Sequence, residues 1–375
     1  MWERILTILR KEFRSVFRDP RMRMVIIGVP IIQTMIFGYA VTLDVRHVQL
    51  VITDHDGTPA SRALVARFTG SAYFDAVAHT DNDETARRWI DAARASAILQ
   101  INAGYQENLR AGRTTPVQLI VDGSDSNTAR FVVNYGTQIA AAANAAVLLE
   151  QTQRRAGRPV SLGTVDLQPR AWFNADLESR NYFVPGIIAL LVMLIGLMLT
   201  SMAIVREKEA GTIEQIMVTP IRPVEFILGK CAPFVAIGFL NTALVSVVGL
   251  FWFQIPLRGS FGLLLLGTAL FLLSTLGIGL FISTVSQTQQ QAMMTTFFFF
   301  FPAMLFSGFI FPISNMPEVI QWLSLLDPLR YILVIIRSVF LKGAGMEVLW
   351  PQFAALLGLG VVVMTFAVSR FHKTL

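Results

Sequence analysis

Residues 206–230 read REKEAGTIEQIMVTPIRPVEFILGK, a charged stretch between two long segments without any charged side chain. One segment runs from Asn181 to Val205 and the other from Cys231 to Leu257. Each is long enough to cross a bilayer as a helix, which takes about 20 residues. The charged stretch is therefore predicted to be a loop between two membrane spans. The other segments of the chain are assigned relative to this loop.

Several features of this loop favour the docking of a soluble partner. Ile213, Ile216 and Met217 have the i, i+3, i+4 spacing that predicts one apolar face of a short helix. Polar and conformational features surround that face: the cations Arg206, Lys208, Arg222 and Lys230, the acids Glu207, Glu209 and Glu214, a Thr212–Gln215 capping box after Gly211, and the helix-ending Pro220 and Pro223. Cations beside span ends mark a cytoplasmic loop. A merely solvated loop is the alternative, but it would need neither a cap nor an apolar face.

At these residues the sequence resembles a known family. EKEAGTIEQIMVTPIRPVEFILGK at 207–230 is similar to the coupling loop of ABC-type export permeases of the ABC-2 class. NYFVPGI at 181–187 resembles that family's entry into its second span. FPAMLFSGFIFPISNMPEVIQWLSLLDPLRYI at 301–332 resembles its segment before the last span. The three motifs occur in the family's order and extend over most of the chain.

The resemblance implies an exporter permease that is not itself catalytic and that moves a drug or lipid-like molecule out across the plasma membrane. It implies two partners, a cytoplasmic ABC ATPase that binds the ATP and Mg²⁺ and a second permease copy or paralogue, and no cofactor in this chain. A periplasmic adaptor is a third partner in a bacterium with two membranes. The residues expected to couple to the ATPase are Glu207, Glu209, Gly211, Thr212, Ile213, Glu214, Ile216, Met217 and Pro220.

Composition places the chain among multi-pass membrane proteins. It has 375 residues, 54% of them hydrophobic, and a mean hydropathy of +0.56, which soluble domains do not sustain. The net charge of +6 comes largely from the flanks of the spans. We therefore attribute it to topology and membrane lipid rather than to nucleic acid, for which no motif is present. The lone Cys231 cannot form a disulfide within the chain.

Charge-free segments predict an all-α six-span bundle with both termini in the cytoplasm. Residues 1–22 are predicted to form an amphipathic helix that lies at the inner membrane surface or packs against the bundle. Residues 23–43 are the expected first span, and residues 181–375 contain five further spans. Within the last part, the fourth and fifth spans share the uncharged segment Gly259–Pro317 around a polar hinge at Ser286–Gln291, and Val348–Ser369 is the sixth. Residues 312–346 are predicted to be a re-entrant segment on the outer side, because their apolar run is too short to span.

This topology puts residues 44–180 outside the cytoplasm, inserted between spans one and two. Expected strands alternate there with expected helices, which predicts a small α/β domain. The strands are Val48–Thr53, Phe74–Ala78, Ala97–Ile101 and Val117–Val121, and the helices are Ser61–Phe68, Asp83–Ala93, Tyr105–Ala111 and Asn127–Gln153.

Motifs for independent chemistry are weak. Gly229-Lys230 lacks the first glycine of a P-loop, since position 224 is Val. Asp54-x-Asp56-Gly57 after a strand resembles the nucleophile motif of haloacid-dehalogenase phosphatases, but the rest of that set is missing, and a turn that caps the next helix is the simpler interpretation. The four histidines lack metal-ligand spacing.

The spans contain polar but uncharged side chains, which argues against a proton relay or ion pore. Candidates for lining a pathway are Asn241, Thr242, Phe298, Met304 and Phe306. A transporter or channel working alone is a second hypothesis, and it predicts intramembrane charge or clear inverted repeats. A third is a membrane-anchored sensor, in which the outer domain binds a ligand and the loop recruits a cytoplasmic protein.

Overall fold

The computed structural model describes residues 9–10, 13–14, 18, 20–40, 47–157, 172–174, 178–211 and 223–374. Internal contacts divide the chain into two compact units, one of residues 43–169 and one that combines 1–42 with 170–375. The first unit is thus inserted into the sequence of the second, and we describe each by itself. Most of the predicted amphipathic helix at residues 1–22 lies outside the described residues.

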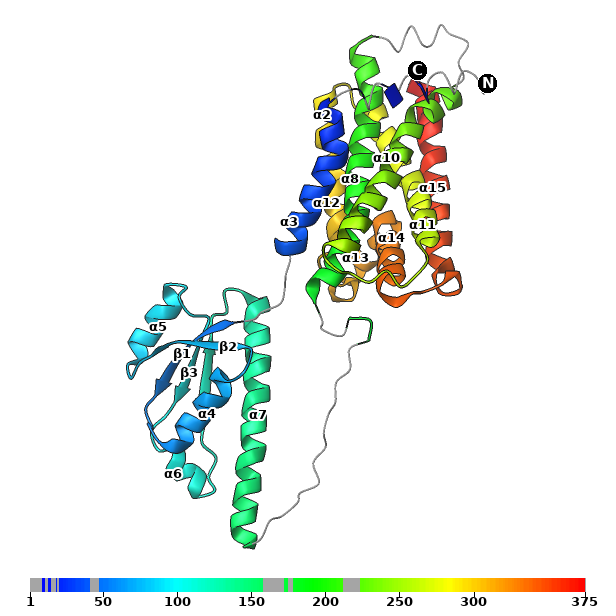
Figure 1. The fold of residues 1–375 in the computed structure, drawn as a ribbon. Helices are drawn as coiled ribbons and strands as arrows, with labels where there is room; N and C mark the ends of the chain where they lie inside the picture. The colour runs from blue at the N-terminus through cyan, green and yellow to red at the C-terminus, as the bar shows by residue number, and fades with distance from the viewer. Residues whose placement is uncertain are drawn as a thin grey trace. The chain divides into compact units, whose positions relative to one another are not determined.

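The inserted unit is a four-stranded sheet with helices on both faces (Figure 1). Its elements are β1 (Val48–Asp54), α4 (Pro59–Thr69), β2 (Phe74–His79), α5 (Asp83–Asp91), β3 (Ala97–Ile101), α6 (Tyr105–Arg110), β4 (Val117–Val121) and α7 (Ser126–Ala156). The strand order is β2-β1-β3-β4, with β1 parallel to β2 and β3, and β4 antiparallel to β3. The predicted strands and helices match these elements to within a few residues.

This unit has two hydrophobic cores, one on each face of the sheet, because successive side chains of a strand point to opposite faces. Leu50 and Ile52 of β1 are buried with Phe68 of α4 on one face. Val51 is buried with Ala86 of α5 on the other. Helix α7 joins the first core through its own apolar residues Val132, Tyr135, Ile139 and Ala143.

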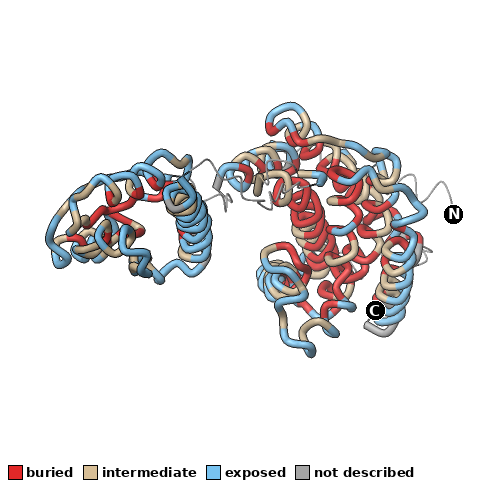
Figure 2. The backbone as a smooth tube through the Cα atoms, turned by 90° about the horizontal axis from the view of Figure 1, so that it is seen from below, coloured by how far each residue is buried: buried red, intermediate tan, exposed pale blue. Residues whose placement is uncertain are grey.

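The second unit is a bundle of long apolar helices. They are η1 (Met24–Gly28), which continues into α3 (Val29–Ala40), then α8 (Ser179–Glu209), α10 (Pro223–Phe251), α11 (Phe261–Val285), α12 (Gln289–Phe306) and α15 (Met346–Thr374). Figure 2 shows the buried residues concentrated inside it. Of the most apolar 18-residue stretch of α8, 72% is buried. Helix α8 packs against α3, α10, α11, α12 and α14 (Pro328–Arg337), so it lies in the interior of the bundle.

Among the described residues, five helices are long and apolar enough to cross a membrane, or six if one bent pair counts as a span. Four of the five, in α8, α10, α11 and α15, fall on predicted spans. The fifth, Thr128–Arg154, belongs to α7 of the sheet unit, where it is mostly exposed. The apolar helix at the predicted first span, Met24–Tyr39, is shorter than a full span. The count of six spans therefore stays a prediction.

Small residues let the central helices approach closely. A Cβ atom at Gly279 of α11 would lie 2.9 Å from Cβ of Thr200 in α8, too close for any side chain. A Cβ atom at Gly360 of α15 would lie 2.9 Å from the Leu273 side chain of α11. Such contacts are typical of membrane helices, which gain little from the hydrophobic effect between helices and depend on close packing.

The bent pair joins Glu318–Leu326 to Pro328–Lys342 at 84°. Asp327 lies at the corner, where Oδ1 accepts the backbone N–H of Leu329 at 2.9 Å and caps α14. Further along, the Arg337 guanidinium lies 3.6 Å from the ring centroid of Tyr182 and donates to the Gly308 carbonyl at 3.2 Å. The aromatic face and the carbonyl oxygen partly compensate the buried cation next to an apolar core, although its Nε has no hydrogen-bond partner among the described residues.

Candidate functional site

The expected coupling loop begins at the end of α8 and ends at the start of α10. Its middle, residues 212–222, lies outside the described residues, and with it Thr212, Ile213, Glu214, Ile216, Met217 and Pro220. The structure describes the two helix ends that hold this segment, including Glu207, Glu209 and Gly211. The site is therefore built from these helix ends.

The two helix ends are joined by a buried ion pair. Lys230 Nζ of α10 donates to Glu207 Oε1 of α8 at 2.7 Å, and the side chains are 6% and 16% exposed. Lys230 also lies 3.4 Å from the Ala203 carbonyl. A lysine withdrawn from solvent needs such a partner, because an unpaired buried charge is costly. Glu207 thus acts inside the bundle, whereas the sequence suggested a place on the polar rim of the loop.

The next residues of α8 contact the junction between α11 and α12. Lys208 Nζ donates to the Ser283 carbonyl at 2.8 Å, in the last turn of α11. Glu209 accepts the backbone N–H of Gln289 at 2.8 Å, at the first residue of α12. A cation at a helix C-terminus and an anion at an N-terminus are both favoured by the exposed backbone groups there. The last turn of α8 therefore contacts α10, α11 and α12 at once.

Gly211 directs the chain away from α8. It has φ +66°, in the left-handed region, directly after the C-cap residue Ala210. Its N–H donates to the Lys208 carbonyl at 3.1 Å. A Cβ atom would meet nothing within 4 Å, so backbone conformation and not space favours glycine here. Glycine adopts this region without the steric penalty that other residues meet there.

The structure separates the pathway candidates. Asn241 and Thr242 are buried in α10, where Thr242 Oγ1 donates to the Gly238 carbonyl at 3.0 Å. Phe298 of α12 is 81% exposed, and Met304 and Phe306 are half-buried. Phe298 thus faces away from the interior that holds the polar pair, and the five do not form one lining. Asn241 is unusual, because neither its Oδ1 nor its Nδ2 has a hydrogen-bond partner among the described residues.

Sequence reasoning missed the role of Gln289. The polar hinge at Ser286–Gln291 was interpreted only as a break between spans, yet Gln289 receives contacts from both Arg206 and Glu209 of α8. A polar hinge that follows an apolar helix and bears no charge of its own was the available signal. The partner on α8 could not be identified without the packing.

In the sheet unit, the Asp-x-Asp-Gly segment is a structural turn. Asp54 Oδ1 accepts the N–H groups of Asp56 and Gly57 at 3.0 Å each, and its Oδ2 accepts the Ser61 hydroxyl at 2.6 Å. Asp56 accepts the Gly104 N–H at 2.9 Å. Each carboxylate oxygen is therefore engaged by the chain itself. Among the described residues no three metal-ligating side chains are grouped.

Comparison with known proteins gives a family and close relatives. The family described as "ABC-2 family transporter protein" matches residues 21–369. The probable multidrug ABC transporter permease YbhR of Escherichia coli K12 is 31% identical over 373 residues, covering 100% of this chain and 99% of its own length. The probable multidrug ABC transporter permease YbhS of the same strain is 34% identical over 345 residues, with 91% and 89% coverage. The linearmycin resistance permease protein LnrN of Bacillus subtilis 168 is 22% identical, with 98% and 97% coverage.

Proposed function

Because the chain belongs to the ABC-2 family of transporter proteins, we propose that it is the permease subunit of an ATP-driven exporter of amphipathic molecules, such as drugs or lipid-like compounds. A cytoplasmic ABC ATPase binds the segment at residues 212–222 and supplies the energy. Two permease copies, or this chain and a paralogue, form the membrane part. The protein lies in a bacterial inner membrane with both termini in the cytoplasm.

The observation that carries this proposal is the linkage at the end of α8. Glu207, Lys208 and Glu209 connect that turn to α10, α11 and α12 respectively. A displacement of the attached segment would thus reach four helices without the need to unfold any of them. Rigid helix motion is how packed interfaces commonly switch between two arrangements. In this proposal the ATPase moves the segment, and the α8 turn distributes the movement.

The character of the substrate is proposed from the bundle interior. Several hydroxyls and one amide are buried in it away from the charged groups. Among the hydroxyls are those of Ser201 and Thr296, whose oxygens lie 3.1 Å apart between α8 and α12. The unpartnered amide of Asn241 is available to a hydrogen-bonding group of a bound molecule. Such an interior suits an amphipathic molecule better than an ion. The names of YbhR and YbhS, which describe multidrug permeases, agree with this choice.

The direct test is co-reconstitution. The chain and an ABC ATPase that co-purifies with it from its native host are placed in proteoliposomes, and ATP-dependent movement of an amphipathic dye is measured. We expect transport that requires both subunits and ATP. A chain that moves the dye without an ATPase would support the second hypothesis, a transporter working alone. A chain that recruits no ATPase from its host would contradict the proposed function.

A further inference from the structure

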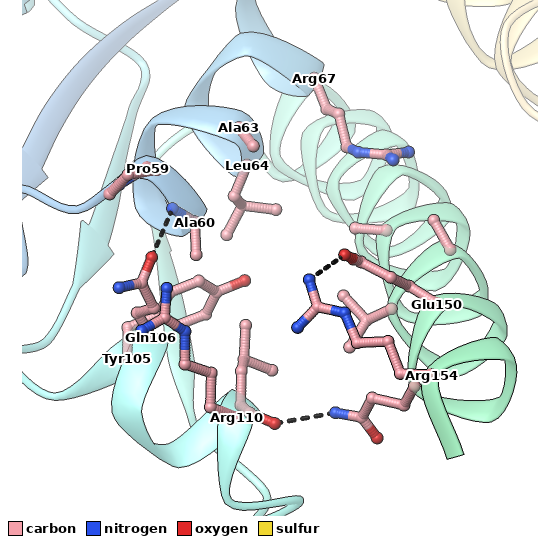
Figure 3. A pocket seen from close by; sticks show the side chains of 15 residues that line it. Pro59, Ala60, Ala63, Leu64, Arg67, Tyr105, Gln106, Arg110, Glu150 and Arg154 are labelled. Carbon is pink, nitrogen blue, oxygen red and sulfur yellow. Dashed lines mark hydrogen bonds and ion pairs between the residues drawn. The ribbon is translucent and has the colours of Figure 1, made fainter. Parts of the chain in front are cut away.

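The sheet unit contains a cleft that the exporter function does not use. It has a volume of about 700 Å³ and is bounded by α4, α6 and the second half of α7. Figure 3 shows the side chains of these three helices converging on it. Small-molecule sites typically occupy about 300–1,000 Å³, so the cleft has the right size for one organic ligand.

Part of the lining of the cleft is apolar. Leu64 of α4, Leu109 of α6 and Val147 of α7 line it together with small alanines, including Ala63 and Ala146. The walls are tied to each other at one end, where Gln151 Nε2 of α7 donates to the Leu109 carbonyl at 2.8 Å. They therefore form a preformed concavity that can accept a hydrophobic body.

The mouth of the cleft is cationic. Three arginines line it, one from each helix: Arg67 of α4, Arg110 of α6 and Arg154 of α7. Arg154 is paired with Glu150, the one acidic side chain in the lining, at 2.5 Å. Arg67 and Arg110 have no ion-pair partner among the described residues. Two guanidinium groups are thus left for an anion, which arginine binds well through its paired donors.

Tyr105 adds a donor inside the cleft. Its side chain is 7% exposed, and its hydroxyl makes no hydrogen bond to any described residue, although it points into the cleft (Figure 3). Burial, and then the nearby Asp56 carboxylate, raise the pKa of Tyr105 above its ordinary value of 10.0. The phenol is therefore protonated at neutral pH and can donate to a ligand oxygen.

We propose that this cleft binds a water-soluble amphipathic anion, an aromatic or aliphatic body with one sulfonate, carboxylate or phosphate group. The body lies against Leu64, Leu109 and Val147, and the acidic group pairs with Arg67 or Arg110, which lie at opposite ends of the cleft (Figure 3). This binding is independent of the proposed ATPase coupling, because all of the cleft residues belong to the sheet unit. A negative transport assay would contradict the proposed exporter function and not the binding proposal. A negative binding assay would contradict the binding proposal and not the exporter function.

The test uses the full chain in phosphatidylcholine nanodiscs, with naphthalene-2-sulfonate as the probe and titration calorimetry as the measurement. Empty nanodiscs are subtracted. We expect saturable binding with one site per chain, and at least about tenfold weaker binding of the neutral naphthalene-2-sulfonamide, since hydrogen bonds to charged groups are the stronger ones. Equal binding of the neutral analogue would contradict the assignment of an anion site.

Matched variants locate the site. Arg67→Gln with Arg110→Gln is expected to weaken binding of the sulfonate about tenfold or more, and Arg88→Gln, an exposed arginine of α5, to leave it unchanged. Ala146→Phe should block the cleft. Ala145→Phe, on the exposed side of the same helix turn, should not. If Ala146→Phe unfolds the unit, Arg67→Lys keeps the test decisive, because it should bind more tightly than Arg67→Gln.

A lipid headgroup is the competing occupant. Repeating the titration in nanodiscs that contain phosphatidylglycerol should give the same affinity. A loss of affinity in those nanodiscs, or wild-type affinity in both the arginine double variant and Ala146→Phe, would overturn the proposal.

Discussion

Lys230 of α10 and Glu207 of α8 form an ion pair of 2.7 Å that joins the two helices on either side of the 212–222 segment. Each residue lies at the boundary between a charged stretch and an apolar one in the sequence. The pair fixes the spacing of the two helix ends, so that a partner bound to the intervening segment acts on both helices together.

Removal of one member of this pair is expected to destabilise the bundle strongly. Glu207→Gln or Lys230→Met should each cost about 3–5 kcal/mol, because the remaining charge is left buried without its partner. The double variant Glu207→Leu with Lys230→Met should cost less than the sum of the two. Thermal unfolding of the purified chain measures all three. Additive effects would mean that the two charges are independent.

The apolar face of the loop is expected to carry the ATPase contact. Ile216→Asp and Met217→Asp should reduce ATP-dependent transport at least about tenfold, because a charge would be placed in an apolar interface without a partner. The variants should still insert and purify. Glu214→Gln, at the expected rim, is the matched control and should be milder. Variants that pull down the ATPase and transport like the wild type would show that the loop is not the coupling element.

Glycine is expected to be required at position 211 because of its backbone conformation and not because of its small size. Gly211→Val should be severe, since a β-branched residue is strongly disfavoured at φ +66°. Gly211→Ala should cost about 1–2 kcal/mol, and Gly211→Asn less, because asparagine tolerates the left-handed region. The measurement is stimulation of the ATPase by each variant, which should fall in the order Gly211→Asn, Gly211→Ala, Gly211→Val. Equal effects of the three would indicate that the glycine has another role.

The Asp56 turn is expected to give the sheet unit a dependence on pH. Burial raises the pKa of Asp56, but hydrogen bonds from Thr58 and from the Gln106 and Gly104 N–H groups outweigh it and lower that pKa below 3.8. The ionised Asp56 carboxylate therefore stabilises the sheet unit fully at a pH above its ordinary pKa of 3.8. This stabilisation is lost as the pH falls through the lowered pKa of the folded protein. Asp56→Ala should cost about 0.5–2 kcal/mol at pH 7.

Calorimetry of the wild type and Asp56→Ala at pH 7 and pH 3 checks this. The two proteins should differ less at pH 3, and an undiminished difference would contradict the argument. No Mg²⁺-dependent phosphate release is expected from either protein. Release that disappears in Asp54→Ala would instead support the phosphatase interpretation of the turn.

The sheet unit is expected to lie outside the cytoplasm. Ser124, which is exposed, can be changed to cysteine in a Cys231→Ser background, so that the chain has one thiol. A membrane-impermeant maleimide should label Ser124→Cys from the side of the inner membrane that faces away from the cytoplasm, as in right-side-out vesicles. Labelling only from the cytoplasmic side would reverse the whole topology.

The sequence by itself determined the features that depend on local chemistry. The charge-free segments predicted the long helices α8, α10, α11 and α15, because a bilayer requires about 20 apolar residues in a row. The alternation of Val48–Thr53 and its neighbours predicted the sheet, because the side-chain period of a strand is two. Gly211 could be identified since only glycine adopts the left-handed region freely.

The tertiary structure alone decided which residues meet. Glu207 and Glu209 have the same charge and lie two positions apart, yet one pairs with Lys230 and the other caps α12, because successive residues of a helix face different neighbours. Phe298 and Asn241 are both predicted to line a pathway, yet Phe298 is exposed and Asn241 is buried. The cleft of Arg67, Arg110 and Arg154 could not be foreseen, because three helices far apart in the sequence each contribute one of its cations.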